Sequence, residues 1–155
     1  MSRRRRNESG AAAVETALCL TFIVLPLVFG IISYAYMFSF RQALSQAAAE
    51  GARAAVGATT GVACPPGGPF NSGCPAQYAA SQAVANDLSQ YGMACGTNHL
   101  TCTISVPADC NDGANQCISV RVTYPYRSHS LMPTIPGFGF ILPPDLSFTS
   151  SVTVS

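Results

Sequence analysis

The sequence has little charge, and its charge is of an unusual kind. Only 10% of its 155 residues are charged, all eight basic residues are arginine, and lysine does not occur. Beyond residue 41 the acidic residues outnumber the arginines. Nucleic-acid binding needs clustered positive charge that neutralises several phosphates, so the composition argues against a nucleic-acid partner.

Motifs for catalysis are also missing. The sequence has no G-x-S-x-G segment, no phosphate-binding Walker loop and no pair of carboxylates at a useful spacing. His99 and Cys102 are close enough in sequence to suggest a catalytic pair, but a disulfide is the expected state of Cys102. We therefore expect a protein that is not an enzyme and needs no cofactor.

Metal-binding patterns are weak. Asp109 and Asp112 flank Cys110, but this run has neither EF-hand spacing nor a closing glutamate, and a solvated turn is the simpler interpretation. His99 and His129 could join cysteines as zinc ligands, yet no C-x-x-C pair is present and an exported chain favours disulfides. No metal site is predicted.

What the sequence does contain is one long apolar stretch near its start. From Thr16 to Phe40 no side chain is charged. At about 1.5 Å per residue, a helix of this length reaches about 37 Å and can cross a bilayer core of about 30 Å. Arg3 to Arg6 precede it, so the positive-inside rule keeps the N-terminus in the cytoplasm. We expect a single-pass protein of the plasma (inner) membrane.

A cleaved signal peptide is the alternative explanation of such a start. The apolar run is longer than the roughly 7–15 residues of a signal-peptide core, and no clear A-x-A site closes it promptly. A cut before the helix is the other way to process the segment. Gly10 offers a small, flexible residue for a protease at the membrane face.

The residues around Gly10 resemble a known family. The segment RRRRNESGAAAVETALCL resembles the type IV prepilin processing site, with a basic leader, a glycine, and a glutamate at the fifth mature position. The longer segment is similar to TadE-like proteins of the tight-adherence (Flp) pilus system, whose usual pattern is G-x-A-x-V-E-F-A-L, an apolar helix and R-Q-A-x-x-x-A-A-R-E-G-A-R. The matching residues are Gly10, Ala12, Val14, Glu15, Ala17, Leu18, Arg41, Gln42, Ala43, Ala48, Glu50, Gly51, Ala52 and Arg53. The sequence departs from the pattern at Thr16 and Ala49.

This resemblance implies a minor pilin or pseudopilin that assembles an Flp-type pilus. Its partners would be the bilayer, other pilin subunits, the Tad assembly machinery and a prepilin peptidase that cuts between Gly10 and Ala11. The mature chain could then enter a surface pilus.

Two residues of the helix are candidates for setting its register against neighbouring helices. Glu15 lies at the cytoplasmic mouth of the span, where an unpaired carboxylate is costly. It could pair with the N-terminal ammonium of a neighbouring subunit, or reach headgroup water near the helix N-terminus. Pro26 predicts a kink or a local break in mid-helix.

Six of the seven cysteines follow the apolar stretch, which predicts three disulfides in an oxidising compartment. Cys19 lies in the span and is expected to behave as a small hydrophobe. Six cysteines allow 15 pairings, although a Cys110–Cys117 bridge would close one loop and Cys64 could pair with Cys74. The candidates are Cys64, Cys74, Cys95, Cys102, Cys110 and Cys117.

The fold class expected is α+β, with a long transmembrane and stalk helix followed by a small, disulfide-stapled exported domain. Pro75 opens a helix that Gly92 stops, and this helix packs on an antiparallel sheet of about three strands. The predicted strands are 99–106, 117–124 and 146–154. The predicted segments are a leader (1–10), a transmembrane helix (11–40), a helical stalk (41–57) and an extracytoplasmic domain (58–155). The stalk either offers small alanine surfaces to neighbouring subunits or is covered by the domain's own core.

Two rival functions share most of these features. A permanently anchored binding module of the cell envelope needs the same topology and disulfides, but neither Gly10 nor Glu15. A secreted disulfide protein would lose residues 16–40 with its signal peptide.

Overall fold

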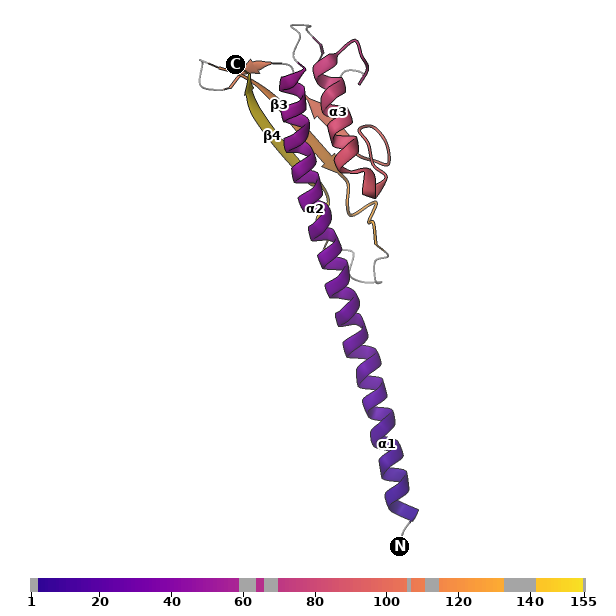
Figure 1. The fold of residues 1–155 in the computed structure, drawn as a ribbon. Coiled ribbons are helices and arrows are strands. Elements are labelled where there is room, and N and C mark those ends of the chain that lie inside the picture. Colours follow the sequence, from indigo (N-terminus) through magenta and orange to yellow (C-terminus); the bar gives the residue numbers. More distant parts are fainter. Residues whose placement is uncertain are drawn as a thin grey trace. The chain divides into compact units, whose positions relative to one another are not determined.

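The structure is a computed structural model that describes residues 3–58, 64–65, 70–105, 107–110, 115–132 and 142–154, with side chains from residue 10 onward. The chain divides into two compact units, Met1–Phe38 and Ser39–Ser155. Helix α2 (Leu25–Gly57) contributes residues to both units. Figure 1 labels the elements in chain order.

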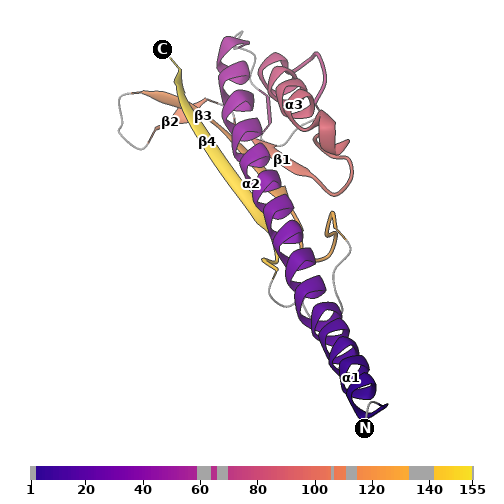
Figure 2. The same cartoon turned by 60° about the horizontal axis from the view of Figure 1, so that its bottom comes forward.

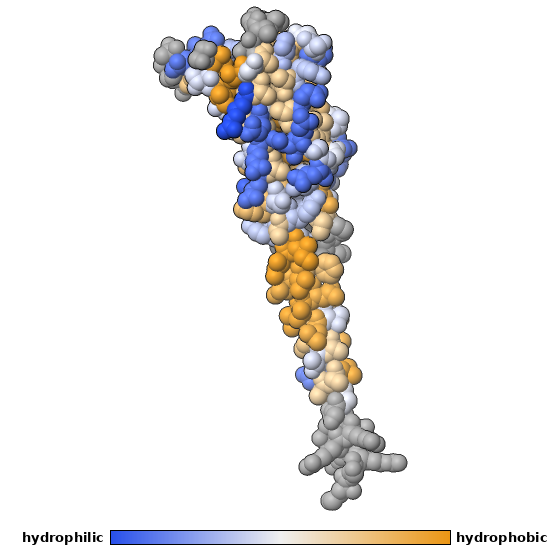
Figure 3. Space-filling model, in the orientation of Figure 1, coloured by the Kyte–Doolittle hydropathy of each residue, from blue (hydrophilic) through white to orange (hydrophobic). Residues whose placement is uncertain are grey.

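The first unit is helical and has an exposed apolar surface. It contains α1 (Arg3–Cys19), the π-helical turn η1 (Leu20–Val24) and the first residues of α2. Large apolar side chains such as Phe22 are exposed, and the orange surface in Figure 3 shows them gathered along the helix. By length and composition, Gly10–Gly57 is the one candidate membrane span in the described part of the chain, and its most apolar window is unburied. A core helix of a water-soluble domain would be covered here.

Pro26 is the second residue of α2, just beyond the π-helical turn that ends at Val24. Proline has no N–H to donate to the carbonyl of Phe22, four residues earlier. The chain nevertheless stays helical, because the N–H of Leu25 donates to the carbonyl of Leu20 across the wider spacing of a π-helix. The structure therefore shows one wide turn where the sequence predicted a kink or a break.

The second unit is built around residues 39–57 of α2. Apolar residues recur here every three or four positions, which places them along one helix face. The buried residues of this face, none more than 8% exposed, are Phe40, Ala43, Leu44, Ala47, Ala48, Ala52 and Ala55. The predicted stalk 41–57 is thus covered by the core of its own domain, one of the two alternatives that the sequence left open.

An antiparallel sheet lies beside this helix. Its central strand β3 (Gln116–Tyr124) pairs with β4 (Leu146–Val154) along its whole length. Strands β1 (Thr101–Ile104) and β2 (Ala108–Asp109) pair in succession with the other edge of β3. The sheet therefore has four strands but is three strands wide, which agrees with the predicted sheet of about three strands.

Helix α3 (Pro75–Asp87) completes the helical layer. It begins with Pro75 as predicted but ends at Asp87, earlier than predicted; a separate 3-10 turn, η2 (Ser89–Tyr91), then leads to Gly92, whose φ of 65° stops it. Residues 39–57 of α2 and helix α3 cover the same face of the sheet (Figures 1 and 2). The α+β class, with a long N-terminal helix and a small sheet, is confirmed.

Three disulfides fasten the ends of these elements, and they join Cys64 to Cys74, Cys95 to Cys102, and Cys110 to Cys117. The first holds the segment before α3, where the side-chain amide of Gln77 also donates to the carbonyl of Pro65 at 2.7 Å. The second ties the turn after η2 to β1, and the third ties β2 to β3. Among the described cysteines only Cys19 is free.

Candidate functional site: the N-terminal helix and its buried continuation

The predicted processing site lies within α1. Gly10 and Ala11 are helical and exposed, and a β-carbon on Gly10 would meet no atom within 4 Å. A glycine weakens a helix by about 1 kcal/mol relative to alanine, so this position is suited to local unwinding. The side chains of the basic leader, Arg3 to Arg6, lie outside the described part of the chain.

Glu15 and Thr16 differ in how their polar groups are satisfied. The hydroxyl of Thr16 donates to the carbonyl of Ala12 at 2.9 Å, so the helix itself satisfies it. This hydroxyl therefore adds no unpaired polar group to a bilayer, although the TadE-like pattern has Phe at this position. The Glu15 carboxylate is exposed and has no hydrogen bond or ion pair with any described residue. In a membrane it needs a partner from another molecule or from the headgroup region.

The second half of the family-like pattern lies where α2 forms the core of the second unit. Its small residues are buried, and its polar and charged residues are exposed. The buried positions are Ala43, Ala48, Gly51 and Ala52, and the exposed positions are Arg41, Gln42, Glu50 and Arg53. This half of the pattern therefore describes an amphipathic helix that packs in a protein core.

Gly51 is a point of close packing in this core. A β-carbon at this position would lie 3.0 Å from Cγ2 of Val84 in α3 and 3.4 Å from Cγ1 of Val120 in β3. Residue 51 thus contacts both the neighbouring helix and the sheet. The glycine of the E-G-A-R segment allows this close approach, a role that was not predicted from the sequence.

The charged residues of the pattern are surface groups with modest interactions. Arg53 Nη1 lies 2.9 Å from Glu50 Oε1, but the two side chains are 70% and 50% exposed, so the pair contributes little stability. The Arg41 guanidinium lies 6.0 Å from the ring centroid of Phe148, at the outer limit of a cation–π contact.

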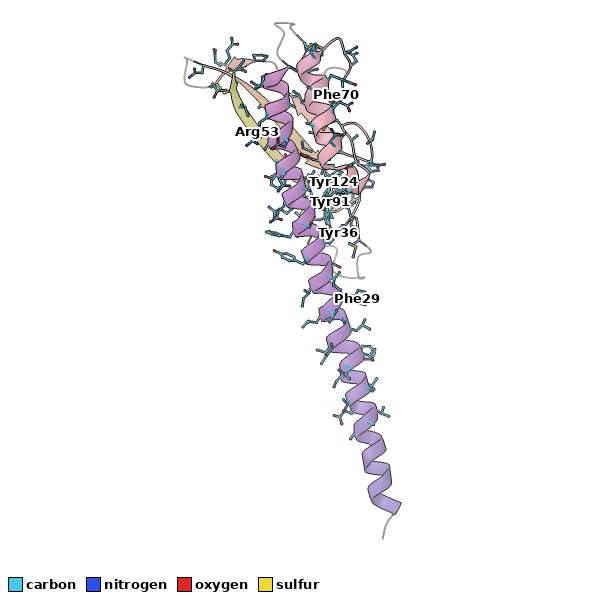
Figure 4. All side chains as sticks on the ribbon, viewed as in Figure 1. Phe29, Tyr36, Arg53, Phe70, Tyr91 and Tyr124 are labelled. Carbon is cyan, nitrogen blue, oxygen red and sulfur yellow. A yellow bond between two sulfur atoms is a disulfide. The ribbon has the colours of Figure 1, made fainter. Side chains whose placement is uncertain are left out.

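An aromatic cluster surrounds Phe40 in the second unit. The ring centroids of Tyr91, Tyr124 and Tyr126 lie 5.0, 5.2 and 6.2 Å from that of Phe40, and the first two contacts are edge-to-face. Figure 4 labels Tyr91 and Tyr124. The Tyr124 hydroxyl donates to the carbonyl of His129 at 2.7 Å, and burial raises the pKa of Tyr124. This cluster was not predicted from the sequence, although the apolar spacing from Phe40 onward was a signal for it.

The residues considered for metal binding or catalysis are arranged differently from what those roles require. The His99 and His129 rings stack, with centroids 3.5 Å apart and planes 10° from parallel. Cys102 is bonded to Cys95, so it is neither a thiolate ligand nor a nucleophile beside His99. Within the described residues no three potential metal ligands cluster. Asp109 is exposed on β2, and Asp112 lies outside the described residues.

The fold and the site define a class: a chain with one membrane-spanning-length helix that continues into a small, disulfide-bonded α+β domain. A family model described as TadE-like protein matches residues 10–53, from Gly10 to Arg53. The resemblance seen in the sequence is confirmed for this segment, and it points to a component associated with Tad pili. No curated protein and no solved structure matches the chain.

Proposed function

We propose that this protein is a minor pilin or pseudopilin of a tight-adherence, Flp-type pilus. It acts by packing its N-terminal helix against the helices of other subunits, in the membrane and in the filament. The observation that carries the proposal is the position of Gly10 and Glu15 at the start of one exposed apolar helix. The TadE-like match over residues 10–53 supports the same assignment.

Processing creates the charge that Glu15 needs. Cleavage after Gly10 by a prepilin peptidase leaves Ala11 with a free ammonium group. In a stack of parallel helices, the Glu15 carboxylate of one subunit accepts hydrogen bonds from the Ala11 ammonium of its neighbour. Each charge is costly to bury alone, so the pair favours one axial stagger of adjacent helices over others.

Helix packing then provides the rest of the assembly contact. In lipid, helices associate through van der Waals packing and close approach at small residues, for which Gly30 has open space around it. The π-helical turn before Pro26 adds a residue to one turn, which rotates the following side chains relative to an uninterrupted α-helix. Pro26 thereby helps set which face meets a neighbour. The N-terminus is cytoplasmic and the disulfide-bonded domain is outside the membrane.

The first test is the N-terminal residue of the protein extracted from membranes of cells with an active prepilin peptidase. Mass spectrometry is expected to find Ala11 at the N-terminus. An intact leader would contradict processing and favour a permanently anchored binding module. Protein found in the culture medium without residues 16–40 would instead indicate a secreted protein.

The second test separates assembly from anchoring. Glu15→Gln removes the charge at nearly constant size, and Glu50→Gln is a matched control on the exposed face of the same chain. We expect Glu15→Gln to insert in the membrane normally but to abolish or strongly reduce piliation, whereas Glu50→Gln assembles pili. Normal piliation with Glu15→Gln would refute the register role.

A further inference from the structure

The face of the sheet opposite α2 and α3 carries a regular array of hydroxyl groups. Antiparallel pairing aligns side chains of neighbouring strands into cross-strand rows. The three rows are Thr101–Thr123–Ser147, Thr103–Arg121–Thr149 and Ser105–Ser119–Ser151. These nine residues, which we call the hydroxyl face, are all exposed or half-exposed. The buried residues of β3, Ile118, Val120 and Val122, point to the opposite side.

Hydrogen bonds hold parts of the hydroxyl face in fixed positions. Arg121 Nε donates to Ser147 Oγ at 3.0 Å, and Ser147 Oγ also lies 3.1 Å from Thr123 Oγ1. Ser119 Oγ donates to Ser105 Oγ at 3.1 Å. A ligand on this face would therefore meet a surface that is already ordered, which lowers the entropic cost of binding.

Arg121 is the one charged member of the hydroxyl face. Within the described part of the chain the only salt bridge joins Arg53 to Glu50, so no described carboxylate neutralises Arg121. Its Nε donates a hydrogen bond to Ser147, while its two terminal nitrogens have no hydrogen bond among the described residues. A guanidinium presented in this way is suited to a carboxylate, with which it forms charge-assisted hydrogen bonds.

The neighbouring groups restrict what kind of anion fits. Protein partners are usually held by buried aromatic or large aliphatic anchors, and the hydroxyl face has none. Nucleic acids need several cations for their phosphates, and the hydroxyl face has one. Eight hydroxyls that both donate and accept hydrogen bonds match a ligand that is itself rich in hydroxyl groups.

We propose that the hydroxyl face binds an acidic polysaccharide. The carboxylate of a uronic-acid unit pairs with the terminal nitrogens of Arg121, and sugar hydroxyls exchange hydrogen bonds with Thr103 and Thr149 in the same row. Binding gives this protein a surface-recognition activity beyond its assembly role. It does not depend on cleavage at Gly10, so the two proposals can fail separately.

The test is isothermal titration calorimetry, in which the full chain in detergent micelles is titrated with polygalacturonate, a uronic-acid polymer. Dextran serves as the neutral polysaccharide and polyglutamate as the acidic peptide. Arg121→Gln removes the charge, and Arg53→Gln is the control for loss of an exposed arginine elsewhere. We expect Arg121→Gln to weaken polygalacturonate binding about tenfold or more, and Arg53→Gln to change it less than about twofold.

A second variant tests the hydroxyl groups without changing charge. Thr103→Val together with Thr149→Val keeps the β-branched shape that strands favour, so the sheet is retained, and circular dichroism checks this. We expect weaker polygalacturonate binding from this pair as well. Three results would overturn the proposal: no binding by the unaltered protein, equal losses in the two arginine variants, or polyglutamate binding as tight as that of polygalacturonate.

Discussion

Gly51 and Val84 approach each other so closely that a β-carbon on Gly51 would lie only 3.0 Å from Cγ2 of Val84. The contact joins α2 to α3, and the same β-carbon would lie 3.4 Å from Cγ1 of Val120 in β3. The glycine of the E-G-A-R segment thus lets α2 pack closely against both its neighbouring helix and the sheet that the two helices cover.

Gly51→Leu should therefore destabilise the second unit. A larger side chain overpacks the space between Val84 and Val120, and overpacking typically costs about 1–3 kcal/mol. The measurement is guanidinium unfolding of the oxidised full chain in detergent, followed by the near-ultraviolet circular dichroism of the tyrosines. Gly57→Ala is the control, since a β-carbon there meets nothing within 4 Å. Equal stability of Gly51→Leu and the parent protein would contradict the packing argument.

Phe40→Ala should destabilise the second unit more strongly. Phe40 is fully buried against three tyrosine rings, and such a truncation in a core costs about 3–5 kcal/mol. The comparison variant is Tyr78→Ala, which removes an aromatic ring that is 42% exposed. In the same unfolding measurement, the free energy of unfolding of Phe40→Ala should be well below that of Tyr78→Ala. The reverse order would show that the aromatic cluster contributes little to stability.

The disulfides should differ in how much they contribute to the free energy of unfolding. Each of the two short bridges closes a loop with a sequence separation of 7, for which chain entropy alone predicts about 2–3 kcal/mol. Cys102 is also buried in the core, whereas Cys110 and Cys117 are half-buried. Replacing Cys95 and Cys102 with serine should therefore cost more stability than replacing Cys110 and Cys117. Alkylation of the unfolded, unreduced chain should label Cys19 alone, and labelling at any other cysteine would contradict the three bridges.

Alkaline pH should destabilise the second unit through Tyr124. Burial raises the pKa of this phenol above its usual value of 10.0, so the folded state favours the neutral form. The stabilisation is complete below about pH 10 and is lost as pH rises through the folded pKa. Tyr124→Phe should flatten this part of the pH profile of unfolding. The variant should also lose about 1 kcal/mol at neutral pH, because the hydrogen bond to the His129 carbonyl is gone. If Tyr124→Phe lost stability with rising alkaline pH as steeply as the parent protein, another group would be responsible for the pH dependence.

The sequence was a good guide where local chemistry decides the structure. Pro75 and Gly92 bracket the helical segment, and alternating residues place β3 and β4 within a residue of their observed bounds. The first predicted strand, 99–106, is shorter in the structure, where β1 covers Thr101–Ile104, and the two-residue strand β2 (Ala108–Asp109) lies in the segment that was predicted to be a loop. Pro107, which precedes β2, has no N–H to donate to a strand ladder.

The sequence was a poorer guide where distant residues decide the structure. The alanines of 41–57 are equally suited to an exposed stalk and to a tightly packed core, and only contacts with Val84 and Val120 distinguish the two. His99 and His129 are 30 positions apart, so their stacking could not be read from spacing. Glu15 remains a prediction, because its proposed partner belongs to another subunit.

The position of Ser39 as the first residue of the second unit determines how a soluble fragment of this protein can be made. A fragment that begins after the α2 helix, at residue 58, would lack Phe40, Leu44 and Gly51. It would expose the inner faces of α3 and the sheet to water, and it should aggregate. In the topology proposed above, the core of the exported domain therefore includes residues that continue its own membrane anchor, so a cut within residues 40–57 would free the domain only by removing part of its core.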